Sequence, residues 1–364
     1  MSYVKPMKRI ISPLLLLTLV LSLSSCLKPD SIKNSTSVVI NLIDVIETTG
    51  FARDVEAHGN KIFVAASQAG NQIWQDDNGT VTKIMEHHFS ASPALRVTLE
   101  PESRILFAFD REKGFFKLLN EELTDFDSVY VTGDCIDIDE NNGNYGSGSN
   151  EDFIARKLND SLVALYVIDR TPSDGLKRYY FNRRFKQPIP FICEGGYYFW
   201  ELSNVGVSTG GINLGMDIRD SLTAISHDEL GVGLYNSARI ELDTLSIVDT
   251  PGEALEVKFY ENYLLSANNW AGMEIFSLGA GGNSLTHVSD IEVGGWVKQI
   301  SIWNDIAVLS CGENGIFLVD LSDPENPKVD QPIEAGYTYR TYVAGDIIYA
   351  ATREGVKRYH IENR

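Results

Sequence analysis

Short hydrophobic runs alternate with polar turns along most of the chain, and these turns contain glycine, asparagine or aspartate. The pattern is clearest in three segments of the C-terminal third, which begin at Gly252, Gly295 and Gly336 and start 43 and 41 residues apart. Each segment has an alternating apolar stretch, a polar turn, a strongly apolar stretch, a turn with glycine and a further strand-like stretch. Because the period is that of strands and no helical period runs through the segments, the pattern predicts an all-β fold.

The same repeat occurs four more times earlier in the chain, with strongly apolar second strands expected near residues 61–66, 105–109, 162–168 and 222–226. Units of roughly 40–45 residues are typical of β-propeller blades, which form rings of about four to eight. The last unit is too short for four strands, whereas residues 38–50 (VVINLIDVIETTG) resemble an unpaired fourth strand. We therefore expect a seven-bladed β-propeller over residues 38–364, closed by pairing of this N-terminal strand with the last blade.

The middle of the chain departs from the repeat length. Residues 134–214 amount to 81 positions, nearly two units, which predicts insertions in blade three. This stretch contains Tyr197, Tyr198, Phe199 and Trp200 in succession. Because four consecutive side chains cannot all face one side of a strand, Tyr197, Tyr198 and Trp200 are candidates for exposed ligand-binding aromatics. The alternative is an outer strand whose aromatic side chains pack against a neighbouring strand.

The N-terminus has the features of a secretory signal peptide. Lys5, Lys8 and Arg9 precede an apolar run over residues 10–23, which is shorter than the roughly 20 residues that cross a bilayer. The run ends in Leu23-Ser24-Ser25-Cys26, which resembles the lipobox of bacterial lipoproteins. That resemblance implies cleavage before Cys26 and acylation of this cysteine, whose acyl chains would anchor the protein in the membrane. Ordinary secretion without a lipid is the alternative.

This interpretation divides the chain into a signal peptide (1–25), a lipidated tether (26–37) and the propeller (38–364). The residue after the cysteine is Leu27 rather than aspartate. In the lipoprotein family this favours the outer membrane over inner-membrane retention, with the propeller facing the periplasm or the outside of the cell.

The segment from Gly315 to Pro327, GIFLVDLSDPENP, resembles the LVIVD-repeat family of bacterial cell-surface β-propellers. The hallmark of that family is an apolar strand ending in aspartate before a Ser-Asp-Pro-x-x-Pro turn. The motif is complete in the sixth unit and partial in the fifth and seventh. The resemblance implies a propeller fold and a location outside the cytoplasm, and the family's motifs define no catalytic residue.

Charge and cysteine content narrow the function further. A formal net charge of −19 excludes a general nucleic-acid binder. If Cys26 is acylated, Cys135 and Cys193 could form a disulfide, and Cys311, in an apolar stretch, is expected to be a buried small hydrophobic residue. No Cys/His spacing indicates a metal site. The acidic loop beginning at Asp137 fails the EF-hand pattern, so we expect no metal and no cofactor.

Residues 206–210 (GVSTG) match a Gly-x-Ser-x-Gly nucleophile motif, which functions between a strand and a helix. Here the flanking sequence is β-like, so no catalytic residue is predicted. We expect a non-catalytic binding or interaction propeller whose partner is a glycan, a small anion or another protein, in addition to the membrane. The alternative is a propeller hydrolase or lyase with its site in the central funnel.

Arginines suggest a ligand site in the channel. Arg53 and Arg96 are 43 residues apart in the first strands of units one and two, and Arg340 has a similar position in unit seven. In a closed ring these units are consecutive, so three guanidinium groups could share one side of the central channel. Such a group would suit bidentate binding of a carboxylate, sulfate or phosphate.

An apolar rim could complete this anion site. Phe51, Trp296 and Tyr337 each follow the glycine that begins a unit. The alternative is that each arginine pairs with an acidic residue of a neighbouring blade, such as Asp54 or Glu256, and only holds the blades together.

Overall fold

The computed structural model describes residues 38–110, 113–126, 142–147, 149–173, 175–186, 197–209, 211–239 and 242–363. The signal peptide, Cys26, the tether, Cys135, Cys193 and the acidic segment 137–141 lie outside these residues, so what we expect of them stays a prediction. Within the described ranges, no helix is both long enough and apolar enough to cross a membrane.

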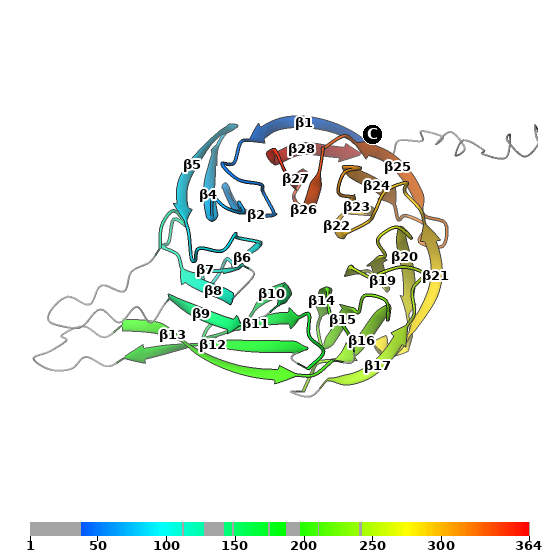
Figure 1. Ribbon diagram of the computed structural model, residues 1–364, viewed down its shortest axis with the longest axis horizontal. Helices are drawn as coiled ribbons and strands as arrows, with labels where there is room; N and C mark the ends of the chain where they lie inside the picture. The colour runs from blue at the N-terminus through cyan, green and yellow to red at the C-terminus, as the bar shows by residue number, and fades with distance from the viewer. Residues whose placement is uncertain are drawn as a thin grey trace, which may run out of the picture. The chain divides into compact units, whose positions relative to one another are not determined.

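The strands of the described residues pair into seven four-stranded antiparallel sheets, which are the blades of a β-propeller (Figure 1). The first strand of each blade lies at the centre of the ring, and successive first strands contact one another all the way round. The predicted all-β, seven-bladed propeller is therefore confirmed. The predicted second strands 105–109 and 222–226 match β7 and β15 at both ends.

The bounds of the strands are as follows. Blade one consists of β2 (Asp54–His58), β3 (Lys61–Ala65), β4 (Asn71–Asp77) and β5 (Thr80–His87), and blade two of β6 (Arg96–Glu100), β7 (Ile105–Phe109), β8 (Lys113–Leu118) and β9 (Asn142–Ser147). Blade three consists of β10 (Asn150–Asn159), β11 (Leu162–Asp169), β12 (Leu176–Lys186) and β13 (Tyr197–Val207), and blade four of β14 (Gly215–Arg219), β15 (Leu222–Ser226), β16 (Val232–Asn236) and β17 (Asp243–Val248). Blade five consists of β18 (Glu256–Tyr260), β19 (Tyr263–Ala267), β20 (Met273–Leu278) and β21 (Leu285–Ile291), and blade six of β22 (Gln299–Trp303), β23 (Ile306–Ser310), β24 (Ile316–Asp320) and β25 (Lys328–Ile333). Blade seven consists of β26 (Thr338–Ala344), β27 (Ile347–Thr352) and β28 (Gly355–Asn363) with β1 (Val38–Ile46), and a short 3₁₀ turn, η1 (Ala280–Gly282), follows β20.

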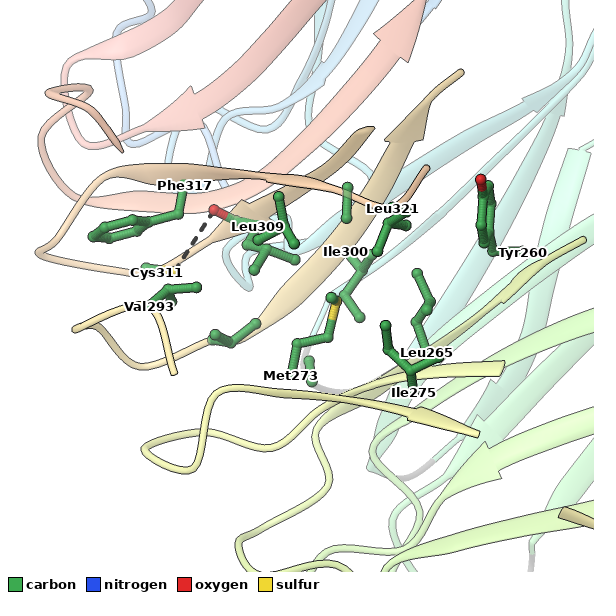
Figure 2. Close-up of a cluster of buried hydrophobic side chains, with 14 residues drawn as sticks. Tyr260, Leu265, Met273, Ile275, Val293, Ile300, Leu309, Cys311, Phe317 and Leu321 are labelled. Carbon is green, nitrogen blue, oxygen red and sulfur yellow. Dashed lines mark hydrogen bonds between the residues drawn. The ribbon is translucent and has the colours of Figure 1, made fainter. Parts of the chain in front are cut away.

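Hydrophobic contacts between blades form the core. Every residue of β3, β7 and β23 is buried, because the sheet of each blade is covered by a neighbouring blade on both faces. Between blades five and six, Leu265 and Met273 pack against Leu309 and Phe317 (Figure 2). Cys311 belongs to this cluster and is 1% exposed, and burial raises the pKa of its thiol to about 12. The prediction that Cys311 is a buried small hydrophobic residue is confirmed.

The N-terminal strand closes the ring, as predicted. β1 pairs antiparallel with β28 from Val38 opposite Asn363 to Ile46 opposite Val356. Arg358 of β28 is 1% exposed and donates hydrogen bonds from Nε and Nη2 to the carboxylate of Asp44 in β1. Its Nη1 donates to Asp76 in β4 of blade one. One guanidinium group therefore connects the N-terminal strand, the C-terminal strand and the following blade.

The insertions are divided between two blades, which corrects the prediction that both belong to blade three. β9 pairs with β8 and is the fourth strand of blade two, so the residues before it belong to blade two. The sequence of β9, NGNYGS, has no apolar run to identify it as a strand. Its position depends on Tyr145, whose buried ring occupies the space that a Cβ at Gly114 would need.

The antiparallel order also fixes which connections share a face of the ring. The segments that lead into the first strands and the turns between second and third strands lie on the same face, which we call the linker face. Isolated backbone bridges join these segments between neighbouring blades, at Ser67 with Ala94, Asp228 with Ala254, Asn269 with Val297 and Gly312 with Thr338.

We predict that Arg358→Met lowers the free energy of unfolding by about 3–5 kcal/mol, because it leaves two carboxylates without their buried partner. Urea denaturation of the purified propeller would measure the change. Arg184→Met is the matched control, since Arg184 pairs with Glu201 where both side chains are more than half exposed, and its loss should cost at most about 1 kcal/mol. Equal effects of the two substitutions would contradict a special role for Arg358 in closure.

Candidate functional site

The central channel contains a cavity of about 310 Å³, lined by residues of the first strands of all seven blades. Each first strand is hydrogen-bonded to a second strand on one side only, so the N–H groups of its other edge have no strand partner. Buried N–H groups of this kind need acceptors. Side chains therefore determine how the channel wall is completed.

Acidic and amide side chains of one blade supply acceptors for the first strand of the next. In each case an oxygen of the earlier blade accepts a backbone N–H of the later one: Asp54 from Val97 at 3.2 Å, Asp152 from Met216 at 3.1 Å, Asp217 from Phe259 at 2.9 Å and Gln299 from Thr341 at 2.8 Å. Such a bond contributes about 1.5–3 kcal/mol when the acceptor is charged. These contacts join blades that share no backbone ladder.

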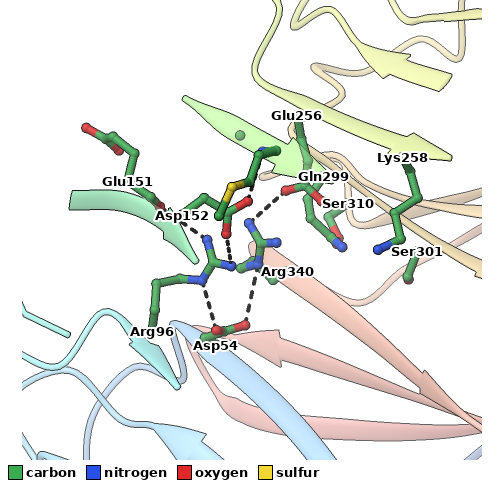
Figure 3. A network of polar contacts seen from close by, with 12 residues as sticks. Asp54, Arg96, Glu151, Asp152, Glu256, Lys258, Gln299, Ser301, Ser310 and Arg340 are labelled. Atoms are coloured by element: carbon green, nitrogen blue, oxygen red, sulfur yellow. Dashed lines mark hydrogen bonds and ion pairs between the residues drawn. The ribbon is translucent and has the colours of Figure 1, made fainter. Parts of the chain in front are cut away.

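Two arginines join these acids into an ion-pair layer, which consists of Asp54, Arg96, Asp152, Glu256 and Arg340 (Figure 3). Arg96 lies between Asp54, with Nε 2.9 Å from Oδ2, and Asp152. Arg340 lies between Asp54, at 3.4 Å, and Glu256, whose Oε2 is 2.8 Å from Nη1. The three carboxylates are at most 6% exposed. The layer is thus a chain of alternating charges that crosses the channel and joins five blades.

The predicted meeting of three unpaired arginines is therefore wrong. Arg96 and Arg340 do meet, but each is already paired with carboxylates, including Asp54 and Glu256, as in the alternative considered from the sequence. Arg53 lies elsewhere: its guanidinium carbon is 4.2 Å from the ring centre of Tyr339.

The error is one of register. Asp54 and Arg96 have equivalent places in their blades, because they face Ala65 and Phe109 at the same point of the ladder. Arg53 corresponds instead to Leu95, and a shift of one residue moves a side chain to the opposite face of a strand.

Glu56 faces the cavity two residues beyond Asp54. Burial raises the pKa of its carboxyl group to about 7, although the Thr98 side chain and the Leu99 N–H, which donates at 3.2 Å, act in the opposite direction. Lys258 also lines the cavity, and the nearby carboxylate of Asp217 raises its pKa. Lys258 therefore stays protonated, whereas Glu56 changes charge near neutral pH.

A second group of charged residues lies on the linker face. We call it the basic aromatic cluster: Arg53, Lys298, Tyr337, Tyr339 and Arg353. The two tyrosine rings are 4.7 Å apart, Arg53 lies over Tyr339 and Arg353 lies 3.9 Å from the ring centre of Tyr337. Lys298 donates a hydrogen bond to the Tyr337 hydroxyl at 3.1 Å. Among the described residues, none of these three cations forms an ion pair with a carboxylate.

The residues predicted as an apolar rim adjoin this cluster rather than Arg96 and Arg340. Phe51 is 46% exposed and Trp296 is 60% exposed, two residues before Arg53 and Lys298 respectively. Tyr337 belongs to the cluster itself. The sequence did contain a signal for Lys298 and Tyr339, because Phe-x-Arg, Trp-x-Lys and Tyr-x-Tyr occupy the same place in units one, six and seven. Nothing in the sequence pattern marks Arg353.

The aromatic run in β13 is only partly as predicted. Trp200 is 7% exposed and packs with Phe116 and Phe181 in the core between blades two and three. Its predicted role as an exposed ligand-binding residue is therefore wrong, and the packed outer strand is what forms. The side chains of Tyr197 and Tyr198 are outside the described residues, so their assignment stays a prediction.

The Gly-x-Ser-x-Gly segment is not followed by a helix. β13 ends at Val207, and the hydroxyl of Ser208 donates a hydrogen bond to the Pro172 carbonyl oxygen at 2.9 Å. Across the ranges that the structure describes, no group of three or more His, Cys, Asp or Glu side chains is arranged to hold a metal ion.

Comparison with known proteins supports the fold and adds no function. No protein-family model and no curated protein matches the chain. A solved structure of the computationally designed Ika8 protein is similar, with a TM-score of 0.57 and 9% sequence identity, over 87% of this chain and 98% of that one. At this identity the similarity concerns the fold alone.

We predict that Glu56→Gln changes stability in a pH-dependent way. An unfolded glutamate titrates near 4.5 and the folded carboxyl near 7, so between these values the native state holds the extra proton and wild-type stability falls as pH rises. The variant should match the wild type at pH 4, below both pKa values, and be more stable by up to about 3 kcal/mol at pH 8. Thermal and urea unfolding at both pH values would measure this, with exposed Glu229→Gln as control. A difference that does not depend on pH would contradict the assignment.

Proposed function

We propose that this protein is a lipid-anchored, non-catalytic binding propeller of the bacterial outer membrane or cell surface, and that it binds an anionic group at the basic aromatic cluster. The lipobox-like Leu23-Ser24-Ser25-Cys26 and the resemblance of residues 315–327 to the LVIVD-repeat family support the location. The observation that carries the binding site is the set of three cations on the linker face, Arg53, Lys298 and Arg353, that form no ion pair with a carboxylate in the described part of the chain. Glu313 interacts with Arg353 only through its longer-range charge.

These cations are unusual in a chain with a net charge of −19, where acidic residues exceed basic ones. The tyrosine rings hold Arg53 and Arg353 by cation–π contacts, each contributing about 0.5–1 kcal/mol at exposed sites. Such stacking uses the flat face of the guanidinium group and leaves N–H groups at its edge for an oxyanion. The cluster is thus oriented before a ligand arrives.

The ion-pair layer is a poorer place for an anion. Arg96 and Arg340 already donate to buried carboxylates, so an added anion would have to displace Asp54 or Glu256. Removing a buried partner of this kind costs about 3–5 kcal/mol. We therefore assign the layer to stability and the cluster to binding.

A second candidate function rests on Glu56. A carboxyl group whose pKa is raised to about 7 within a cavity is suited to general acid–base catalysis. It favours the hydrolase or lyase alternative with a site in the funnel. Turnover of a sugar or organic-acid substrate that is lost in Glu56→Gln, while the fold is retained, would support this candidate over pure binding.

For the anchor, we predict that Cys26→Ala moves the protein from the membrane fraction to the soluble fraction, because the acyl chains have no attachment point. Cell fractionation without detergent, followed by immunoblotting, would measure the distribution. Ser31→Ala in the tether is the control and should stay with the membrane. Unchanged membrane retention of Cys26→Ala would contradict the lipoprotein assignment.

For the ligand site, we predict that sulfate, titrated at constant ionic strength, raises the melting temperature of the wild type. A ligand at 100 times its Kd stabilises the native state by about 2.7 kcal/mol. The double variant Arg53→Met/Arg353→Met should lose this rise and keep its fold. Arg219→Met is the control, because Arg219 also stacks on an aromatic ring, Phe259, but belongs to blade four. A sulfate effect that persists in the double variant would exclude the cluster.

A further inference from the structure

We infer that the ligand of the basic aromatic cluster is an acidic glycan whose neutral sugar rings stack on Trp270 and Trp296. This inference rests on the proposed anion-binding function and specifies its ligand. Trp270 and Trp296 are 62% and 60% exposed, more than any other large hydrophobic side chain in the described ranges. Exposed apolar side chains indicate an interaction site when they form one patch rather than when they are scattered singly.

Backbone contacts place the two tryptophans on adjoining segments. Asn269 and Val297 exchange hydrogen bonds of 3.0 and 2.9 Å between the blade five turn and the segment leading into blade six. Trp270 follows Asn269, and Trp296 precedes Val297. Both indoles therefore belong to the linker face at the same blade junction.

The tryptophans are continuous with the cluster. Lys298 is two residues beyond Trp296 and donates to the Tyr337 hydroxyl, while Arg353 stacks on the Tyr337 ring. At the junction of blades seven and one, the Ala52 N–H donates to the Thr352 carbonyl oxygen at 3.0 Å, which places the Phe51 segment beside Arg353. The binding surface is thus an arc over blades five, six, seven and one, with aromatic rings at both ends and cations between them.

The arrangement fits an oligosaccharide in which neutral rings adjoin a uronate or sulfate group. The C–H face of a pyranose ring is apolar and can cover an aromatic ring, and carboxylate or sulfate oxygens suit the cations in the middle of the arc. Glu253 accepts a hydrogen bond from Asn269 at 2.7 Å, beside Trp270, where it could accept sugar hydroxyls but would repel a further anion. The charge of the ligand therefore belongs over the cluster and its neutral rings over the tryptophans.

Two other ligands fit less well. An anionic membrane surface would extend beyond the cations of the arc and meet the rest of a protein whose net charge is −19, which would repel it, whereas an oligosaccharide contacts only the arc. An acidic peptide would match the cations, but the aromatic rings stand on separate loops and not in the continuous groove that an extended or helical peptide uses.

Binding of defined oligosaccharides to the purified propeller would test the inference, by calorimetry at constant ionic strength. The probes are hexasaccharides of hyaluronan, chondroitin sulfate and polygalacturonate, with maltohexaose as the neutral sugar and hexaglutamate as the acidic peptide. We expect at least one acidic hexasaccharide to bind and both comparison probes to bind at least about tenfold more weakly. Trp270→Ala and Trp296→Ala should each weaken that binding about tenfold, whereas exposed Leu42→Ala in β1 should not.

The sulfate titration separates the two proposals. Both tryptophan variants should keep the sulfate-dependent rise in melting temperature, because the cations remain. If sulfate binds but no acidic hexasaccharide does, or if hexaglutamate binds equally well, or if the tryptophan variants bind like the wild type, the glycan inference is overturned and the anion site stands. If the wild type responds to neither sulfate nor any acidic hexasaccharide, the proposed function itself fails.

Discussion

The free inner edge of each blade is the constraint on which the structure depends. A first strand has a partner on one side only, and its remaining N–H groups are buried against the next blade, where an unsatisfied donor costs about 1–3 kcal/mol. Asp54, Asp152, Asp217 and Gln299 satisfy these donors across the gap between blades. Carboxylates placed there for the backbone then require cations, which Arg96 and Arg340 provide. The charges at the centre of the ring thus follow from a backbone requirement.

The residues that stabilise the ring are therefore different from those that we propose to bind a ligand. Asp54 accepts from the backbone of blade two and pairs with arginines of blades two and seven, so a single carboxylate couples three blades. Carboxylate and guanidinium groups that are paired with one another in this way cannot also bind a ligand. The uncommitted cations lie instead on the linker face, where Tyr337 and Tyr339 hold them in place of carboxylates. The charges at the centre of the ring are thus paired with one another, whereas the cations of the linker face contact aromatic rings, and for this reason we propose the linker face as the binding site.

The sequence was sufficient to predict the number of blades and their closure, because each unit repeats the same strand pattern and residues 38–50 supply the missing strand. It was insufficient for β9, whose NGNYGS sequence is identified as a strand only by its packing on Gly114. The candidate site failed for a different reason. Arg53 and Arg96 are 43 residues apart, close to one repeat length, but the residue equivalent to Arg96 in blade one is Asp54. Sequence spacing alone cannot reveal such a shift of one residue. Phe51, Trp296 and Tyr337 were expected around the channel arginines but lie in or beside the basic aromatic cluster, and Arg353 becomes their neighbour only in the folded ring.

The direction of β1 determines the face at which the chain enters the ring. As the outermost strand of its blade, β1 runs toward the linker face, where the chain turns through Phe51 into β2. Val38, at its start, therefore lies at the opposite face, about 30 Å away along a nine-residue strand. A tether that precedes Val38 would therefore attach to the ring at the face opposite to Trp270, Trp296 and the cluster. A ligand could then approach the linker face without meeting the point of attachment.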